Sequence, residues 1–383
     1  MQTELGRIWW ALPGPHSFIS DVVDALEEGR SIILALPSTA PTGLHGHLIA
    51  NVDLRGTLEW KTVDLSGAGR VAQILANELI PLARRPPRAF ANDIVVDPGL
   101  QATVVQLTGI EQGGRFKEFV AFLAEFLSCI RKSSRSKRAT PRLLFDLPRA
   151  LLRNPQIGSD LDTIRLFEWA GRVRPSDMQL YVSTRMQGRS GLGPTNLFER
   201  IVVEFAGWDS NLADELSKWP SADLLHPLPG LQELAWSRDM RGLSWQAGTQ
   251  DMFGARSLSH ILHHVATDDH DEVTKRLWRA HVSEVFPWLE EIRVHLIDCF
   301  RSAIRLPHEL ESGEVIRNAN LLEIGQLYWN LRYAAQLPEE QLDLVKLCRF
   351  ARNDLAHRRP VETPRLHSLE REWRAALARS TPV

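Results

Sequence analysis

The sequence has few cysteines, no marked excess of charge and no long apolar run. Its 383 residues include only three cysteines, Cys129, Cys299 and Cys348, whose spacing matches no zinc motif and whose odd number argues against a disulfide framework. A formal net charge of −2 excludes binding of nucleic acid through an overall basic surface, so any such contact needs a local patch. Apolar runs such as 119–130 fall short of the roughly 20 residues that a membrane-spanning helix requires. We therefore expect a cytoplasmic protein without a membrane segment and without a bound metal.

Length and composition predict two folded domains. Hydrophobic residues make up 44% of the chain and charged residues 24%, as in globular proteins, and the chain exceeds one ordinary core of about 100–150 residues. Residues 1–250 alternate short β-type runs with helical patterns, which is typical of a mostly parallel α/β sheet. Residues 256–383 lack strand signals and read as a bundle of four or five helices. The Pro-rich stretch 220–230 and the Gly-bearing residues after it are the expected hinge.

The spacing of apolar residues predicts the individual elements. Helices are expected at 18–28 and 115–130 in the first domain, because each has one broad apolar face. Strands are expected at 31–36, 92–96, 103–106, 142–147, 179–183 and 201–205. Helices of the second domain are expected at 271–305, 320–337, 339–357 and 363–378.

The residues after the first expected strand, 36–45, form a small-residue loop that precedes a helix, as in a phosphate-binding loop. Thr42 and Gly43 fit that layout, but Leu44 stands where the lysine belongs and a histidine stands where the magnesium-binding hydroxyl belongs. Asp146 ends a later strand, where such folds place an acid near the nucleotide. In this order of elements the domain resembles a degenerate P-loop NTPase domain, such as those of AAA-type and signal-transduction ATPases. The resemblance implies ligand sensing or scaffolding without ATP hydrolysis, and an unrelated sheet that binds no nucleotide is the alternative.

The connection between the helix at 115–130 and the strand at 142–147 is rich in lysine and arginine and contains no acidic residue. Such a patch can bind the backbone of RNA. A solvated helix-to-strand loop is the alternative. The residues that we expect to contact RNA are Arg131, Lys132, Arg135, Lys137 and Arg138.

The end of the helix expected at 339–357 carries Arg352, Asn353 and His357. Asn353 and His357 are four residues apart and share a face, and the long Arg352 side chain reaches the same end. Cleavage of RNA without a metal needs a group that moves protons and a fixed cation beside the phosphate. His357 fits the first role, Arg352 fits the second, and Asn353 fits a hydrogen bond that orients either group. A capping arginine and histidine at a helix end is the structural alternative.

Arg352, Asn353 and His357, as RNxxxH, resemble the signature of the HEPN superfamily, whose helical domains occur in many RNases of toxin–antitoxin, CRISPR-associated and phage-defence systems. The resemblance covers roughly 256–383. It implies a metal-independent endoribonuclease that uses no cofactor, leaves a 2′,3′-cyclic phosphate and acts as a homodimer through its C-terminal helices.

Residues outside the motif extend this resemblance. The sequence FPWLEEIR at 286–293 is similar to the first long helix of such domains, which implies a supporting acid at Glu290 and a phosphate contact at Arg293. Because these two residues are three apart, a surface ion pair is the alternative. Arg358 and Arg359 would guide the RNA strand.

Two other sets of residues have spacings similar to those of functional sites. The same separation of arginine and histidine occurs at Arg276 and His281, so this separation is not specific. A histidine- and aspartate-rich stretch at 260–270 has metal-capable side chains but no matching zinc motif.

The sequence thus supports two functions of different classes. The first is a HEPN-type endoribonuclease that acts in phage defence or toxin–antitoxin abortive infection, is controlled by its N-terminal domain, and has RNA, a second copy and an antitoxin as partners. The second is a non-catalytic adaptor or RNA-binding subunit of a multiprotein defence complex. A nucleotide-binding regulator without turnover is a third reading.

Overall fold

The chain divides into two units in the computed structural model. The first comprises Met1–Asp177 and Leu243–Leu258, and the second comprises Met178–Gly242 and Ser259–Val383. This division differs from the predicted boundary at 250–256, because helices within Met178–Gly242 pack with the C-terminal helices. The structure describes residues 8–111, 114–133, 136–148, 163–189, 193–194, 196–238, 240–310, 312–333 and 339–380.

A five-stranded sheet forms the centre of the first unit, and all of its strands are parallel in the order β2-β3-β4-β1-β5. The strands are β1 (Ser31–Ala35), β2 (Glu59–Asp64), β3 (Thr103–Thr108), β4 (Arg142–Asp146) and β5 (Ile164–Glu168). The helices are α2 (Pro13–Glu27), α3 (Leu44–Arg55), α4 (Val71–Leu79), α5 (Ala91–Val96) and α6 (Arg115–Lys132). A separate pair of strands, β6 (Gln250–Phe253) and β7 (Arg256–Ser259), follows much later in the sequence.

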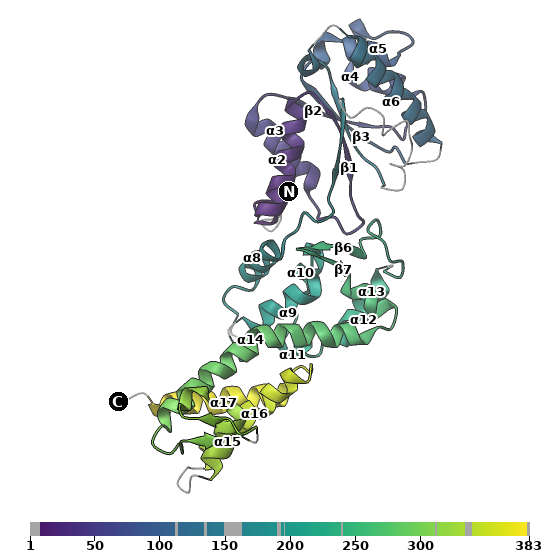
Figure 1. The fold of residues 1–383 in the computed structure, drawn as a ribbon. Helices are drawn as coiled ribbons and strands as arrows, with labels where there is room; N and C mark the ends of the chain where they lie inside the picture. Colours follow the sequence, from purple (N-terminus) through teal and green to yellow (C-terminus); the bar gives the residue numbers. More distant parts are fainter. Residues whose placement is uncertain are drawn as a thin grey trace. The chain divides into compact units, whose positions relative to one another are not determined.

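Helices cover both faces of this sheet. Helices α4, α5 and α6 pack on one face, where Phe119 of α6 meets Phe145 of β4 with ring centroids 4.9 Å apart. Helices α2 and α3 lie on the other face (Figure 1), where Phe18 packs edge-on against Trp169 at 5.0 Å. Because its central strands are buried on both sides, they read as continuous apolar runs in the sequence. The predicted α/β sheet is therefore confirmed.

Three predicted strands are wrong, because tertiary packing made them helical. Residues 92–96 lie in α5, residues 179–183 in α8 (Pro175–Met186), and residues 201–205 in α9 (Leu197–Ala206). In α9 the buried residues follow the helical spacing although valine and isoleucine are common in strands. In α8, Met178, Tyr181, Val182 and Met186 show the same spacing of three to four.

The two strands of this sheet that the sequence did not predict, β2 and β5, are its edges. Most residues of β2 are exposed or partly exposed, and β5 buries only two of its five residues fully. Edge strands bury less apolar surface than central ones, so their sequences carry no hydrophobic run to mark them. The expectation that residues 256–383 contain no strand is also wrong, because the short pairs β6–β7 and β8–β9 place three strands there.

The second unit is mainly helical, as predicted for the C-terminal part. Besides α8 and α9, its helices are α10 (Ser210–Leu216), α11 (Ser221–Leu225), α12 (Leu228–Ser237), α13 (Ile261–Ala266), α14 (His270–Cys299), α15 (Ile324–Arg332), α16 (Glu339–Ala356) and α17 (Thr363–Ser380). Helix α14 packs on α9 and on α16, and α16 packs on α15 and α17. None of the helices in the described ranges is both long and apolar enough to span a bilayer.

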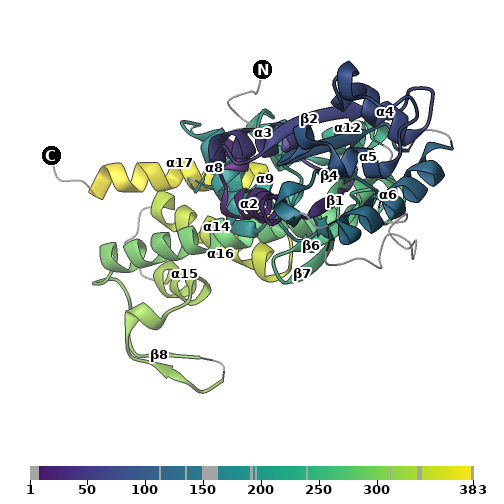
Figure 2. The ribbon, with the colours of Figure 1, turned by 90° about the horizontal axis from the view of Figure 1, so that it is seen from above.

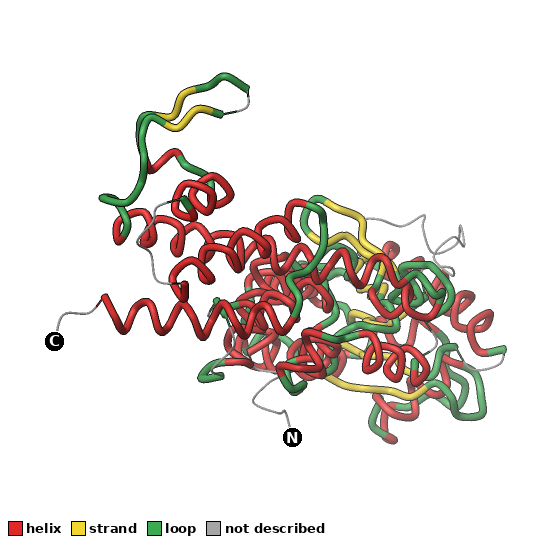
Figure 3. Tube along the Cα trace, turned by 90° about the horizontal axis from the view of Figure 1, so that it is seen from below, coloured by secondary structure: helices red, strands yellow, loops and turns green. Residues whose placement is uncertain are grey.

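Helix α14 is shorter at its C-terminal end than predicted. The expected helix at 271–305 ends at Cys299, although it passes through Pro287 without ending. A hairpin of β8 (His308–Glu309) and β9 (Val315–Ile316) follows and projects away from α14–α17 (Figure 2 and Figure 3). Helix α15 begins at Ile324, four residues after the start of the helix expected at 320–337, and residues 334–337 of that range lie outside the described residues.

Candidate functional site

The end of α16 carries the three residues of the predicted catalytic motif. Arg352 and Asn353 are partly buried and lie in the last turns of the helix, and His357 directly follows its last residue and is exposed. The N–H of His357 donates to the carbonyl oxygen of Asn353 at 3.0 Å. Arg358, which is exposed, then adopts a left-handed φ of 57°, a conformation that ends helices. This helix end fixes where the three side chains emerge.

Neighbouring helices hold this helix end in place. Nε1 of Trp278 in α14 donates to the carbonyl oxygen of Leu355 at 2.8 Å. Asp354 forms ion pairs with Arg365 of α17 and with Arg359, the latter at 3.3 Å. The guanidinium of Arg359, expected to guide RNA, is therefore partly engaged within the protein, although its side chain is 65% exposed.

Arg352 has a partner that the sequence did not single out as a site residue. Its Nη2 lies 2.8 Å from Oε2 of Glu323, the residue before α15. The backbone N–H of Glu323 donates to Oε1 of Gln326 at 2.8 Å, an arrangement typical of helix starts. An acid followed three residues later by glutamine is a sequence signal for such a start, but it does not predict which arginine the acid would contact.

The predicted supporting pair, Glu290 and Arg293, forms an ion pair on α14 with Nε and Oε2 2.8 Å apart. Nη1 of Arg293 also donates to the carbonyl oxygens of Asn320 and Leu322, at 3.0 Å each. The segment that carries these carbonyl groups ends at the acid that binds Arg352. The supporting pair and the predicted catalytic arginine are therefore joined through one short segment.

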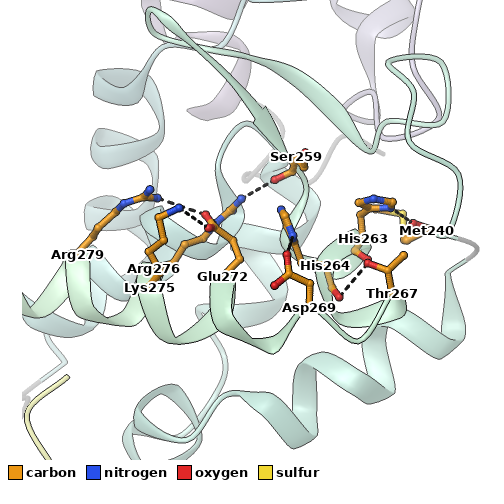
Figure 4. Close-up of polar contacts among 10 residues, drawn as sticks. All are labelled: Met240, Ser259, His263, His264, Thr267, Asp269, Glu272, Lys275, Arg276 and Arg279. Carbon is orange, nitrogen blue, oxygen red and sulfur yellow. Dashed lines mark hydrogen bonds and ion pairs between the residues drawn. The ribbon is translucent and has the colours of Figure 1, made fainter. Parts of the chain in front are cut away.

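The second arginine and histidine with the same separation, Arg276 and His281, are structural, and Figure 4 shows the contacts of Arg276. Arg276 is 1% exposed, and its guanidinium forms an ion pair with Glu272 at 3.2 Å and donates to the carbonyl oxygen of Ser259. His281 is also 1% exposed, and its burial lowers its pKa to about 4. Neither side chain is open to a substrate, so exposure distinguishes this pair from Arg352 and His357.

The histidines of the stretch 260–270 have separate partners, and Figure 4 shows those of His263 and His264. The contacts are His264 Nδ1 with Asp269 Oδ2 at 2.8 Å, His263 Nδ1 with the carbonyl oxygen of Met240 at 2.8 Å, and His260 Nε2 with Asp209 Oδ2 at 3.3 Å. Within the described residues, no group of three or more His, Cys, Asp or Glu side chains could hold a metal ion.

In the first unit, the loop between β1 and α3 is held by other parts of the chain. The N–H of Ser38 donates to the carbonyl oxygen of Gln246 at 3.0 Å, and its hydroxyl donates to the next carbonyl oxygen at 2.6 Å. Nε1 of Trp10 donates to the carbonyl oxygen of Thr42 at 3.1 Å. Part of the loop backbone that would surround a phosphate is therefore bonded to protein.

A cavity lies beside this loop. Gly43, with a φ of 86°, starts α3, and Leu44, which stands in the lysine position, is 4% exposed and packs inward. Nε2 of His45 lies 3.1 Å from Oδ1 of Asp146, and both residues line a cavity of about 390 Å³ at the carboxyl ends of β3 and β4. In open α/β sheets, ligands bind outside the carboxyl ends of the strands, and the cavity lies at such ends. Glu111 also lines the cavity.

The basic connection after α6 is exposed in part. The exposed residues among those expected to bind RNA are Arg131, Lys132 and Arg138. Arg135 lies outside the described residues, and only the backbone of Lys137 is described. Arg142, at the end of the run, is buried, and it donates to the carbonyl oxygen of Leu26 at 2.7 Å. Its role is therefore structural.

No model of a known protein family matches the chain, and no curated protein matches it. Its function is therefore inferred from its own residues and their geometry.

Proposed function

We propose that the chain is a metal-independent endoribonuclease with its site at the end of α16. The observation that carries the proposal is that Arg352, Asn353 and His357 lie within the last turns and at the end of α16, where the first two are partly exposed and His357 is exposed. The buried pair of Arg276 and His281 has the same separation without this exposure. The resemblance of the motif to HEPN ribonucleases supports the same activity.

The proposed reaction needs only proton transfers and one fixed cation. The 2′-hydroxyl loses its proton while its oxygen bonds to phosphorus, the bond from phosphorus to the 5′-oxygen breaks, and the 5′-oxygen takes up a proton. The products are a 2′,3′-cyclic phosphate and a 5′-hydroxyl. His357 exchanges one of these protons, Arg352 offsets the charge that develops on the phosphorane, and Asn353 orients the reacting groups by a hydrogen bond.

The active form in this proposal is a homodimer. One chain supplies a single motif histidine, whereas the reaction uses a base at one oxygen and an acid at another. Two chains related by a twofold axis through their C-terminal helices bring two copies of His357 to one substrate.

The first unit is proposed to control this site by sensing a ligand or a protein partner. Thr42, Gly43 and Asp146 lie around the start of α3 and the adjacent cavity. The described residues that line the cavity include no lysine or arginine, so a triphosphate would lack the cation that offsets its charge there. The resemblance to P-loop domains supports sensing or scaffolding at this position, and ATP hydrolysis is not part of the proposal.

A non-catalytic adaptor or RNA-binding subunit of a defence complex is the second candidate, and one observation favours it. The charge of Arg352 is already offset by Glu323 at 2.8 Å, so a phosphate must displace this carboxylate before Arg352 can act on it. If Arg352 stays paired with Glu323, it cannot offset the charge on the phosphorane, and the chain would bind RNA without cleaving it.

Cleavage of cellular RNA by the purified full chain in EDTA tests the first candidate. The wild type should produce fragments that end in 2′,3′-cyclic phosphates. His357→Ala should lower the rate roughly 10²–10⁴-fold, the usual contribution of a proton-transferring group. Arg352→Ala should lower it by a comparable factor because the phosphorane charge is then unopposed.

Two matched controls are available in the same unit. Arg301 pairs with Asp298 at 2.7 Å on the protein surface, as Arg352 pairs with Glu323, and His367 is an exposed histidine on α17. Arg301→Ala and His367→Ala should cleave like the wild type. If the wild type is silent in vitro, overexpression in cells decides: toxicity that His357→Ala relieves supports a restrained nuclease, and equal growth of both strains favours the adaptor.

A further inference from the structure

We propose that exposed aromatic rings on α15 bind single-stranded RNA and lead it to the end of α16, an inference that rests on the proposed function. The aromatic face consists of Trp329 on α15 and Tyr333, which directly follows the helix, and the buried ring of Tyr328 packs beside Trp329 with centroids 5.2 Å apart. Trp329 is 39% exposed and Tyr333 is 67% exposed, and their rings are stacked with centroids 6.4 Å apart and planes 23° apart. Exposed, roughly parallel rings offer flat surfaces on which bases can stack.

Two arginines lie over these rings. The guanidinium of Arg332 is 5.2 Å from the ring centroid of Trp329, and that of Arg349 is 5.0 Å from the same ring and 5.1 Å from Tyr328. In the described part of the chain, neither arginine has a carboxylate within ion-pair distance. Their charges therefore remain available for the phosphates between stacked bases, and their planar groups can themselves stack.

The aromatic face is continuous with the proposed site. Arg349 and Arg352 are three residues apart on α16 and so share a face, and α16 packs against α15 (Figure 1). Arg349 contacts the middle of α15, and Arg352 contacts Glu323 at its start. From Trp329 to Glu323 the chain covers six residues, or about 9 Å of helix, so a strand of a few nucleotides can reach from the rings to Arg352.

Chemistry favours an unpaired strand as the occupant. Rings stack on the faces of bases, which a duplex covers with neighbouring base pairs, and arginines without carboxylate partners attract phosphates. A purely apolar contact between two copies of the chain would bury these arginines beside one another without a counter-charge, which costs free energy. Single-stranded RNA offsets both charges.

Binding of a fluorescent 2′-O-methyl RNA oligonucleotide to the full-length chain, measured by anisotropy, tests the proposal. This probe lacks the attacking hydroxyl and is not cut. Trp329→Ala should raise Kd about tenfold or more, whereas Trp329→Phe, which keeps a ring, should stay within about threefold of the wild type. Arg349→Gln should weaken binding and reduce the dependence of log K on log salt by about one phosphate contact. Trp236→Ala, which removes an 80% exposed tryptophan on α12, should have no effect.

Three results would overturn the proposal. The first is equal binding of the probe by the wild type and Trp329→Ala, and the second is equal affinity of the wild type for single-stranded and duplex probes. The third is a Trp329→Ala chain that becomes monomeric in light scattering, because the aromatic face would then be a contact between two copies of the chain. The proposed function fails separately. If Arg352→Ala loses cleavage while Trp329→Ala binds the probe like the wild type, the proposed nuclease stands and the role of the aromatic face fails. If Trp329→Ala weakens binding but the wild type cleaves no RNA, the role of the aromatic face stands and the proposed nuclease fails.

Discussion

Replacing Arg276 with methionine should destabilise the second unit by about 3–5 kcal/mol, whereas the same change at Arg352 should cost at most about 1 kcal/mol. Both arginines precede a histidine by five positions, and both pair with a glutamate. They differ in burial, because Arg276 is 1% exposed and the Arg352 side chain is 37% exposed. The comparison therefore separates an arginine that the fold needs from one that the proposed reaction needs.

The contacts of Arg276 set the magnitude. Its Nη1 donates to the carbonyl oxygen of Glu204 at 3.3 Å, and its Nη2 donates to that of Ser259. Methionine fills much of the space but leaves both buried acceptors without a donor, at about 1–3 kcal/mol each. Glu272 keeps Lys275 at 2.9 Å, so its charge stays paired and adds less to the loss. At Arg352, only a solvent-exposed ion pair disappears.

Calorimetric unfolding of the full chain measures both changes, since it can resolve the transition of each unit. For a unit of this size a loss of 1 kcal/mol lowers Tm by about 2–4 °C, so Arg276→Met should lower one transition by roughly 6–20 °C. Arg276→Lys keeps the charge but loses the planar guanidinium, so its fall in Tm should lie between those of Arg352→Met and Arg276→Met. A shift below about 3 °C for Arg276→Met, or an equal shift for Arg352→Met, would refute the reasoning.

Two other changes can be measured on the same protein. Burial lowers the pKa of His281 to about 4, below its ordinary value of about 6.5. As pH falls from about 6.5 to 4, this histidine therefore takes up a proton in the unfolded chain but stays neutral in the folded one. The second unit should lose about 3 kcal/mol of stability across this range. Urea midpoints across this range should fall less steeply in His281→Asn, and parallel curves would contradict the assignment. Burial also raises the pKa of the Cys348 thiol, while Cys299 is exposed, so a thiol reagent followed by mass spectrometry should modify Cys299 in the native protein and Cys348 only after unfolding. Equal rates at the two cysteines would show that α16 opens readily.

Strands of the sheet could be predicted from the sequence where both of their faces are buried, but not where only one face is buried. Strands β1, β3 and β4 are covered on both faces, so their apolar runs are visible in the sequence. Strand β2 buries one residue fully and has no such run. The run at 201–205 has the composition of a strand, but its packing against α14 selects the helix α9. Local composition cannot report that choice, because α14 lies more than 60 residues further along the chain.

The residues of the candidate site that lie close together in the sequence could be predicted, whereas those that packing brings together could not. Arg352, Asn353 and His357 belong to one helix end, and their sequence pattern already places them together. Glu323 lies 29 positions away and reaches Arg352 only through the packing of α15 on α16. Burial of Arg276 is likewise a tertiary property, so the separation from a histidine could not by itself distinguish Arg276 from Arg352. The rings of α15 carry no motif, and they become informative only when Arg349 is placed over them.

The division of the chain into two units sets an order for folding during synthesis. The ribosome completes Met178–Gly242, part of the second unit, before it makes Leu243–Leu258, which belongs to the first. Until Gln246 emerges, the loop after β1 lacks the carbonyl group that binds Ser38. The sheet can form early from the first 177 residues, but the loop after β1 gains its bond to Gln246 only after more than 60 further residues have been made. A stalled or truncated product that ends before residue 243 would therefore lack both the carbonyl groups that hold the loop after β1 and the helix α14 on which α9 packs.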